Sequence, residues 1–309
     1  MVEITGFVGR DREVSAALAA LEKGNNLLVV GRAGIGKSAF LRELFERTRA
    51  TRPCLWSPSG NAKAVTYELA RQLHERFGLG VPEEMLPRRY RLRLRRSGRV
   101  EWEWINRALS RMPVRESMAL LARSVRGKSA LIFIESLEVP PAQAELFALL
   151  IEEAQVVAAM DDTNRRARIQ RLLWRFREKL VLKPLPAADC RSIAERWLES
   201  RPLRFESERV RASFLRAIEQ DSGGVPAAIR GMLEAASTEP EITRATVRGF
   251  AHEAGVRYLD MTPTLVIGLM AVVASRYIAS GMNNNELYML SGIGIALFIG
   301  LRVLMLRLK

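Results

Sequence analysis

The feature that most constrains this chain is a glycine-rich loop between two apolar segments. Residues 31–38 read GRAGIGKS and match the pattern G-x-x-x-x-G-K-[ST] at every fixed position. The apolar run 27–30 predicts a buried strand before the loop, and residues 39–45 have the spacing of an amphipathic helix after it. This order places backbone N–H groups and the positive end of a helix around a phosphate. The sequence therefore predicts a nucleotide-phosphate site here, in preference to a glycine-rich turn that matches by chance.

The residues of the loop have separate expected roles. Lys37 is expected to reach the β- and γ-phosphates of a nucleotide, and the Ser38 hydroxyl is expected to hold Mg²⁺. The rest of the predicted phosphate cradle consists of residues whose backbone N–H groups turn inward, namely Gly31, Ala33, Gly34, Ile35 and Gly36. ATP and Mg²⁺ are therefore the predicted cofactors.

Further apolar runs predict the remaining strands of a sheet. The continuous apolar run 130–134 is typical of a central strand in a parallel sheet. Runs at 53–56, 155–160 and 180–182 predict three more strands, and segments with helical periodicity separate several of them. Strands that alternate with helices in this way predict an α/β fold with a parallel sheet.

The segment ahead of the loop carries a family resemblance. Val8-Gly9-Arg10, with Glu13, resembles the h-G-R-x-x-E box that precedes the phosphate loop in AAA+ ATPases of the origin-recognition type and in STAND ATPases. In those families the segment packs beside the adenine, so the resemblance implies that Val8, Gly9 and Arg10 contact the nucleotide. An ordinary helix start with Asp11 as its acidic residue is the alternative interpretation.

The run 130–134 resembles the Walker B strand of these families but departs from it at the end. Glu135 stands where the usual magnesium-binding Asp is found, and Ser136 stands where a catalytic acid often follows. Two interpretations stay open. Either Glu135 is the magnesium ligand and catalysis falls to Glu138 or to no residue, or Glu135 is the catalytic acid and the magnesium carboxylate is missing. ATP binding is thus a safer prediction than rapid hydrolysis.

Two later segments resemble further parts of AAA+ sites. Residues 161–164, which read DDTN, follow the run 155–160, where related ATPases carry a polar sensor of the γ-phosphate. Asp161 is one candidate sensor, and the sequence does not select among the four. Arg175 and Arg177 resemble by position the arginine finger that AAA+ rings offer to the adjacent subunit, which implies a homo-oligomer. A surface-charge interpretation is at least as favoured for either arginine alone.

Residues 184–258 are predicted to form a helical lid after an ATPase core of residues 1–183. Lys183-Pro184-Leu185-Pro186 breaks the strand–helix pattern, and helical segments follow. The turn 223–226, which reads GGVP, precedes a helix rich in small residues and resembles the GxP motif of the STAND lid. Pro at the first helical turn with glycines before it is a good helix start. The resemblance places Pro226 beside the nucleotide.

An arginine-rich stretch interrupts the core within an insertion at 86–100. Residues 88–99 contain seven arginines and no acidic residue, and alternation of Arg with Leu predicts a strand with one cationic face. Such a face could bind nucleic-acid phosphates, lipid headgroups or an acidic patch of a neighbouring subunit. A solvated insertion is the alternative of equal weight. The net charge of +14 agrees with an anionic partner, and two cysteines and two histidines without metal-like spacing exclude a zinc site.

The last fifth of the chain, residues 261–309, has the composition of a membrane hairpin. Segments 262–281 and 287–306 are each as long as a bilayer-spanning helix, roughly twenty residues. Small residues recur every four positions in both segments, as in closely packed membrane helices. Basic residues at the outer flanks predict that both chain ends face the cytoplasm. The alternative is a helical hairpin buried in a soluble oligomer.

These features predict an α/β P-loop NTPase with a parallel sheet, a helical lid subdomain and two C-terminal transmembrane helices. The expected function is that of an ATP-binding protein in the inner (cytoplasmic) membrane, multi-pass, with its ATPase domain in the cytoplasm. Its nucleotide state would control self-association and act on the membrane, with slow hydrolysis because the acidic pair after residue 134 is atypical.

Two other functions remain open at this stage. The first is a membrane-tethered nucleic-acid ATPase related to initiators or transposition helpers, which is not favoured because no helix-turn-helix or winged-helix domain follows the lid. The second is a scaffold that binds ATP without turnover. The predicted partners are ATP, a membrane and further copies of the chain.

Overall fold

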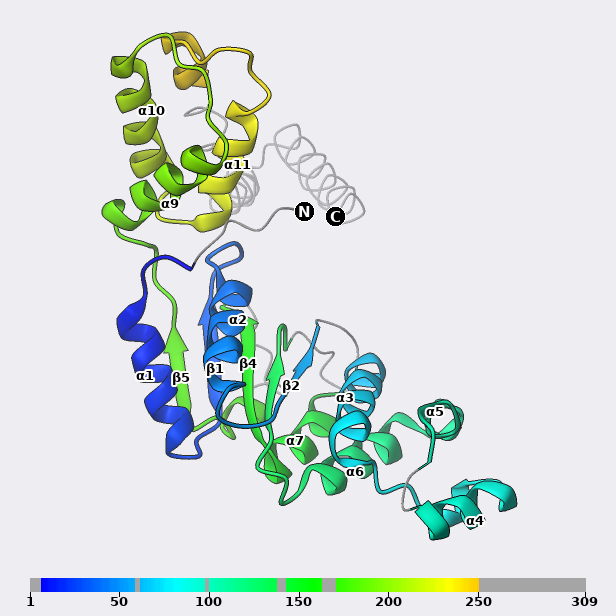
Figure 1. Cartoon of the computed structure of the whole chain (residues 1–309). Coiled ribbons are helices and arrows are strands. Elements are labelled where there is room, and N and C mark those ends of the chain that lie inside the picture. The colour runs from blue at the N-terminus through cyan, green and yellow to red at the C-terminus, as the bar shows by residue number, and fades with distance from the viewer. Residues whose placement is uncertain (1–6, 59–61, 98–99, 138–142, 163–170, 250–309) are drawn as a thin grey trace, which may run out of the picture. The chain divides into compact units, whose positions relative to one another are not determined.

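The computed structural model describes residues 7–58, 62–97, 100–137, 143–162 and 171–249, which form a parallel sheet with helices on both faces (Figure 1). The five strands lie in the order β2-β3-β4-β1-β5, and every pairing is parallel. Their bounds are β1 Leu27–Gly31, β2 Cys54–Ser57, β3 Leu131–Ile134, β4 Gln155–Asp161 and β5 Glu178–Val181. The predicted α/β fold with a parallel sheet is confirmed. Because all strands run the same way, the segments that follow β1, β3 and β4 meet at one edge of the sheet.

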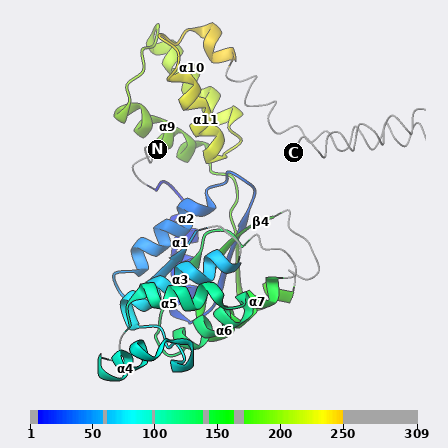
Figure 2. The same cartoon turned by 90° about the vertical axis from the view of Figure 1, so that its right-hand side faces the viewer.

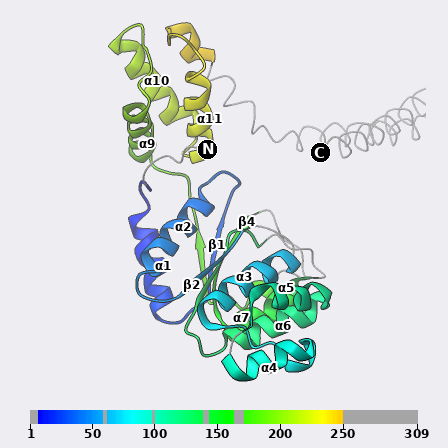
Figure 3. The same ribbon diagram turned by 45° about the vertical axis from the view of Figure 1, so that its right-hand side comes forward.

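Alternate residues of the central strands supply two separate cores. In β1, Leu27 and Val29 join the core under α1 (Asp11–Glu22) and α2 (Lys37–Thr48), whereas Leu28 and Val30 join the opposite core. That second core is covered by α3 (Ala62–Phe77), α6 (Val114–Val125) and α7 (Ala144–Glu153), as Figure 3 shows. Both faces of β1 are therefore buried, which explains why the strand reads as an unbroken apolar run.

Residues 88–97 of the arginine-rich stretch form a helix, so the strand predicted from its Arg–Leu alternation is wrong. The predicted insertion of residues 86–100 contains α4 (Arg88–Ser97), and it lies between a short 3-10 helix (Glu83–Met85) and α5 (Trp102–Arg111). Tyr90 of α4 is buried and stacks on Trp104 with ring centroids 4.0 Å apart. A helix satisfies its own backbone hydrogen bonds, whereas a strand needs a neighbouring strand. The alternating pattern therefore does not decide the structure of this segment.

After β5 the chain forms α9 (Ala187–Ser200), α10 (Glu208–Asp221) and α11 (Pro226–Ala236), here called the lid helices (Figure 2). They lie in the range expected for the lid, and α9 packs against both α10 and α11. The turn between α10 and α11 requires glycine at position 224, where φ is +72° and a Cβ atom would lie 2.4 Å from the Leu185 carbonyl oxygen. The Gly224 carbonyl accepts a hydrogen bond from Leu185 N, which fixes the turn to the start of the lid. The domain boundaries at 183 and 258 stay predictions.

The predicted transmembrane segments 262–281 and 287–306 lie outside the described residues. The chain divides into two compact units, residues 1–251 and 252–309, and the described residues all lie in the first. Among the helices that the structure describes, none is both long enough and apolar enough to cross a bilayer.

Replacing Phe133 with alanine is expected to lower the free energy of unfolding by about 3–5 kcal/mol, because a fully buried ring leaves a cavity. Phe133 is 0% exposed on β3, and its ring contacts those of Phe45 and Trp56 at centroid distances of 5.4 and 6.0 Å. Urea denaturation followed by circular dichroism measures the change. Leu92→Ala is the control, because Leu92 is 54% exposed and its loss should change stability by less than about 0.5 kcal/mol. Equal stability of the Phe133→Ala variant and the unmodified chain would contradict this assignment of the core.

Candidate functional site

The loop after β1 has the backbone conformation of a phosphate cradle. Gly34 and Gly36 have φ values of +76° and +95°, in the left-handed region that favours glycine. At Gly31 a Cβ atom would lie 2.7 Å from the Ile35 side chain, which is itself 1% exposed and anchors the loop in the core. The glycines therefore let the chain turn tightly directly after β1. A loop of this conformation, followed by a helix N-terminus, suits a phosphate group.

Helix α2 begins at Lys37, so its N-terminus lies at the end of the loop. Its first turn contains no acidic residue that would neutralise the partial positive charge of the helix end. Ser38 lies in this turn and supplies a hydroxyl oxygen. The loop and the helix end together fit the triphosphate that the sequence predicts.

Lys37 is held by three acceptors. Its ammonium group donates to the carbonyl oxygens of Gly31 and Arg32, each at 3.0 Å, and forms a close ion pair with the Asp161 carboxylate. The pair exists because β1 and β4 are neighbours in the sheet and their register places Gly31 opposite Asp161. Of the four sensor candidates, Asp161 is thus the one that the structure brings to the loop. Asp162 is exposed, and residues 163–164 lie outside the described residues.

Oxygen donors suited to Mg²⁺ gather at this edge of the sheet. Glu135 follows β3 and is partly exposed. Its backbone N–H donates to the Ser57 carbonyl at 3.0 Å. Ser38 lies in the first turn of α2, and Asp161 ends β4. Mg²⁺ in nucleotide sites is commonly held by one or two such protein oxygens together with phosphate oxygens, so these donors fit the ion. Glu138 lies outside the described residues, and its predicted catalytic role stays a prediction.

Arg10 ties the N-terminal box to the loop and to the start of the lid. Its side chain is 8% exposed, and its Nη2 donates to the Ile35 carbonyl at 2.9 Å and to the Lys183 carbonyl at 3.1 Å. Burial lowers the pKa of the Arg10 guanidinium, and the carboxylates of Glu13 and Asp189 partly offset this effect. The structure thus places Arg10 against the loop, whereas the adenine contact expected of Val8, Gly9 and Arg10 stays a prediction.

The backbone of this box is also constrained by the lid. Gly9 and Arg10 have φ values of +71° and +66°, and a Cβ atom at Gly9 would lie 2.4 Å from the Asp189 carboxylate on α9. The positive φ therefore favours glycine at position 9, and any larger residue there would also have to displace the Asp189 carboxylate. In the sequence, Gly9 followed by Arg10 was the only indication of this backbone conformation.

The N-terminus of α11 touches the phosphate loop. The backbone N–H of Ala227 donates to the Gly34 carbonyl at 3.2 Å, and a Cβ atom placed on Gly36 would lie 3.6 Å from Pro226 Cγ. The structure therefore places Pro226 beside the loop, whereas the nucleotide contact that the resemblance implies for Pro226 stays a prediction. The hydrogen bond from Ala227 was not foreseen, because it depends on how the lid helices dock on the core.

The structure does not bring Arg175 and Arg177 to this chain's own loop. They precede β5, and the start of β5 pairs with the start of β1, whereas the loop follows the end of β1. The Arg175 guanidinium forms an ion pair with Glu152 of α7, and Arg177 is exposed. A contact of either arginine with nucleotide therefore requires a second copy of the chain, and their finger role stays a prediction.

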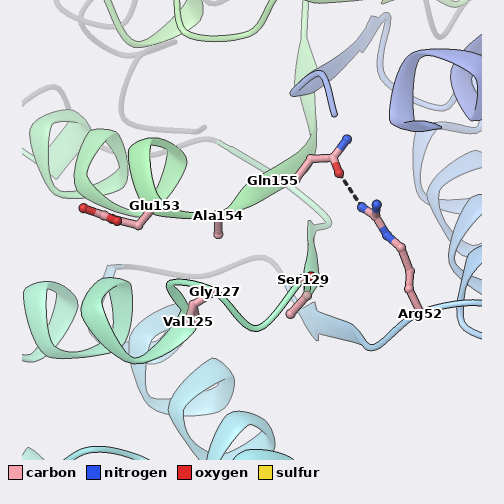
Figure 4. A pocket seen from close by; sticks show the side chains of 8 residues that line it. Arg52, Val125, Gly127, Ser129, Glu153, Ala154 and Gln155 are labelled. Atoms are coloured by element: carbon pink, nitrogen blue, oxygen red, sulfur yellow. Dashed lines mark hydrogen bonds between the residues drawn. The ribbon is translucent and has the colours of Figure 1, made fainter. Parts of the chain in front are cut away.

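A cavity of about 360 Å³ lies at the opposite edge of the sheet, where β4 begins (Figure 4). Arg52 Nη2 donates there to Gln155 Oε1 at 2.5 Å, while the Gln155 amide nitrogen donates to the carbonyls of Leu21 and Asn25. The lining residues are Arg52, Val125, Gly127, Ser129, Ala130, Glu153, Ala154 and Gln155. None of the predicted site residues lines this cavity, so it is separate from the phosphate loop.

Comparison with solved structures supports the fold. The DNA-bound ORC1 protein of Aeropyrum pernix matches with a TM-score of 0.52 and 15% identity, over 93% of this chain and 77% of that one. Cdc6p of Pyrobaculum aerophilum gives 0.52 and 16%, over 93% and 82%, and the A. pernix ORC2 protein gives 0.51 and 13%, over 91% and 78%. A search of curated proteins gives no match.

Comparison with protein families covers most of the chain. Residues 6–229 match the family described as "AAA ATPase domain", a range that includes the phosphate loop, Asp161 and Pro226. This match extends over more than half of the sequence. The chain therefore belongs to the AAA ATPase domain family.

Proposed function

We propose that this chain binds and hydrolyses ATP with Mg²⁺ and that the bound nucleotide controls the lid helices. One observation carries the proposal: the Ala227 N–H donates to the carbonyl of Gly34, a residue of the phosphate loop. Ala227 lies in the first turn of α11, directly after Pro226. A single hydrogen bond thus joins the predicted phosphate cradle to the lid. A change in the loop backbone on nucleotide binding would reach α11 without any intermediate element.

In this proposal each site residue has a physical task. The loop N–H groups and the α2 N-terminus bind phosphate oxygens, and Lys37 adds a positive charge. Ser38 and Glu135 would hold Mg²⁺, which neutralises charge on the β- and γ-phosphates when bound. Arg10 keeps the Ile35 carbonyl fixed and so preserves the shape of the loop. Glu135 followed by Ser136 leaves the activation of water without its usual acid, so slow turnover is expected.

Replacing Lys37 with alanine is expected to weaken ATP binding by about tenfold to a hundredfold, since charge-assisted hydrogen bonds to phosphate are lost. Titration of the full-length protein with a fluorescent ATP analogue, in detergent micelles and Mg²⁺, measures the dissociation constant. Lys23→Ala is the matched control, because Lys23 is an exposed lysine at the end of α1. Equal affinity of the Lys37→Ala variant and the unmodified chain would exclude this loop as the ATP site.

We further propose that the protein is a STAND-like switch of the inner (cytoplasmic) membrane that self-associates in the ATP state. The support for the membrane is the composition of residues 262–281 and 287–306. The support for self-association is the surface before β5, where Trp174 is 81% exposed beside Arg175. Exposed tryptophan and arginine are enriched at protein–protein interfaces. The lid turn of residues 223–226, with Pro226 against Gly36, supports the STAND-like assignment.

The membrane part of the proposal predicts that the full-length protein sediments with membranes and is released by detergent but not by high salt. It also predicts that ATP increases the particle mass in detergent, because ordered copies share the surface around Trp174. Light scattering with and without ATP measures this mass, with Lys37→Ala as the control that should not respond. Release by salt alone would contradict the membrane anchor, and an unchanged mass would contradict nucleotide-controlled assembly.

Nucleic-acid binding is a second candidate function, because α4 presents a cationic surface. Arg88, Arg95 and Arg96 are exposed on this helix, and Arg95 forms a partly exposed ion pair with Glu83 at 2.8 Å. Helix α4 lies at the outer side of α3 and α6 (Figure 3). The solved structure of the A. pernix ORC1 protein, one of the similar folds, is a complex with DNA. Arginines on one helix surface can contact successive phosphates of a nucleic acid.

This second function predicts salt-dependent binding of duplex DNA that decreases when α4 is neutralised. The Arg88→Gln/Arg96→Gln double variant should reduce the slope of log affinity against log salt by about two, one for each lost phosphate contact. Arg196→Gln/Arg209→Gln is the matched control, with the same charge change at exposed positions of α9 and α10. Fluorescence anisotropy over a salt series measures the slope. Weak binding that does not respond to salt would exclude the function.

A further inference from the structure

All three N–H donors of the Lys37 ammonium group are engaged within the protein. A protonated lysine has three such donors and no acceptor. They meet the carbonyl oxygens of Gly31 and Arg32 and the carboxylate of Asp161. The Lys37 side chain is 14% exposed, and that of Asp161 is 30% exposed. A phosphate oxygen that approaches Lys37 must therefore displace one of these three acceptors.

The three acceptors are not equivalent toward a phosphate. The two carbonyls belong to the loop and are neutral, whereas Asp161 carries a negative charge at the end of β4. Like charges a few ångströms apart in a partly buried site repel strongly, since the effective dielectric constant there is about 20 rather than that of water. A triphosphate at the loop thus competes with Asp161 for Lys37 and is also repelled by it.

We propose that Asp161 is a counterion that couples ATP binding to Mg²⁺. ATP without metal has to break the Lys37–Asp161 ion pair and leave a carboxylate beside its own phosphates. With Mg²⁺ present, the released carboxylate would be attracted to the divalent cation. Ser38 and Glu135, at the same edge of the sheet, would hold that cation. Asp161 in this way also adds a carboxylate at this edge of the sheet, where Ser136 takes the place of the acid that usually follows the Walker B strand. The inference rests on the proposed ATP binding at this loop.

The coupling has a direct thermodynamic consequence. In the unmodified chain the dissociation constant of ATP should be much larger in EDTA than in Mg²⁺. In the Asp161→Asn variant the repulsion and the competing ion pair are both removed while the side-chain size is kept. Affinity for metal-free ATP should then increase by about tenfold or more, and the ratio of the two dissociation constants should decrease correspondingly.

The experiment is a titration of the full-length protein with fluorescent ATP, in Mg²⁺ and in EDTA. Asp162→Asn is the matched control, because it removes the same charge from the next residue, which is exposed; it should keep the ratio of the unmodified chain. Asp161→Glu keeps the negative charge and should retain most of the Mg²⁺ dependence of ATP binding. Circular dichroism of each variant verifies that it is folded.

The outcomes separate this inference from the proposed function. If the unmodified chain binds ATP and the Asp161→Asn variant shows the same ratio, the counterion role is wrong and ATP binding stands. An equal decrease in the ratio for Asp161→Asn and Asp162→Asn would also overturn it, because the effect would then be one of general charge. If the unmodified chain binds no ATP in either buffer, both the proposed function and the inference are contradicted.

Discussion

The register between β1 and β4 is the constraint on which the rest of the site depends. Hydrogen bonding between these parallel strands places Gly31, the last residue of β1, opposite Asp161, the last residue of β4. Lys37 can then contact the start of its own loop and the neighbouring strand at once. A shift of the register by one residue would turn the Asp161 side chain to the other face of the sheet and leave Lys37 without its anion. The two apolar cores fix this register, because Val157 and Ala159 belong to one and Val156 and Ala158 to the other.

Arg10 shows how strongly the loop, the N-terminal box and the start of the lid depend on one another. Burying a guanidinium group is costly unless its donors find acceptors. Its Nη2 has two carbonyl acceptors, from Ile35 and Lys183, whereas its buried Nη1 has no hydrogen-bond partner among the residues that the structure describes. The carboxylates of Glu13 and Asp189 lie close enough to favour the charged form. The loop is therefore fixed to the segment that leads into the lid by a partly compensated buried charge.

Local sequence patterns were sufficient to predict those elements whose conformation depends on interactions between residues close together in the sequence. The run 27–30, the glycines of the loop and the run 130–134 predicted β1, the phosphate cradle and β3, because apolar periodicity and glycine conformation act within a few residues. The order of strands in the sheet is not encoded locally. For this reason the sequence could not select Asp161 among the four sensor candidates. The hydrogen bond between Ala227 and Gly34 was not foreseen because it depends on how α11 docks on the core. Helix α4 was missed because a short Arg–Leu alternation is compatible with the periodicity of a strand as well as that of a helix. In the structure, the stacking of buried Tyr90 on Trp104 stabilises the helix.

The contacts of the loop form one continuous path from β4 to the lid. Asp161 holds Lys37, Lys37 holds the carbonyls of Gly31 and Arg32, and the Gly34 carbonyl receives the N–H of Ala227 on α11. A ligand that takes over Lys37 changes the first contact, and the glycines between Lys37 and the lid allow the loop backbone to adjust. The ligand can shift the lid only by as much as its affinity differs between the two loop conformations. Coupling through this path therefore requires that triphosphate and diphosphate favour different conformations of the loop. If both ligands favoured the same loop conformation, exchanging one for the other would not move α11.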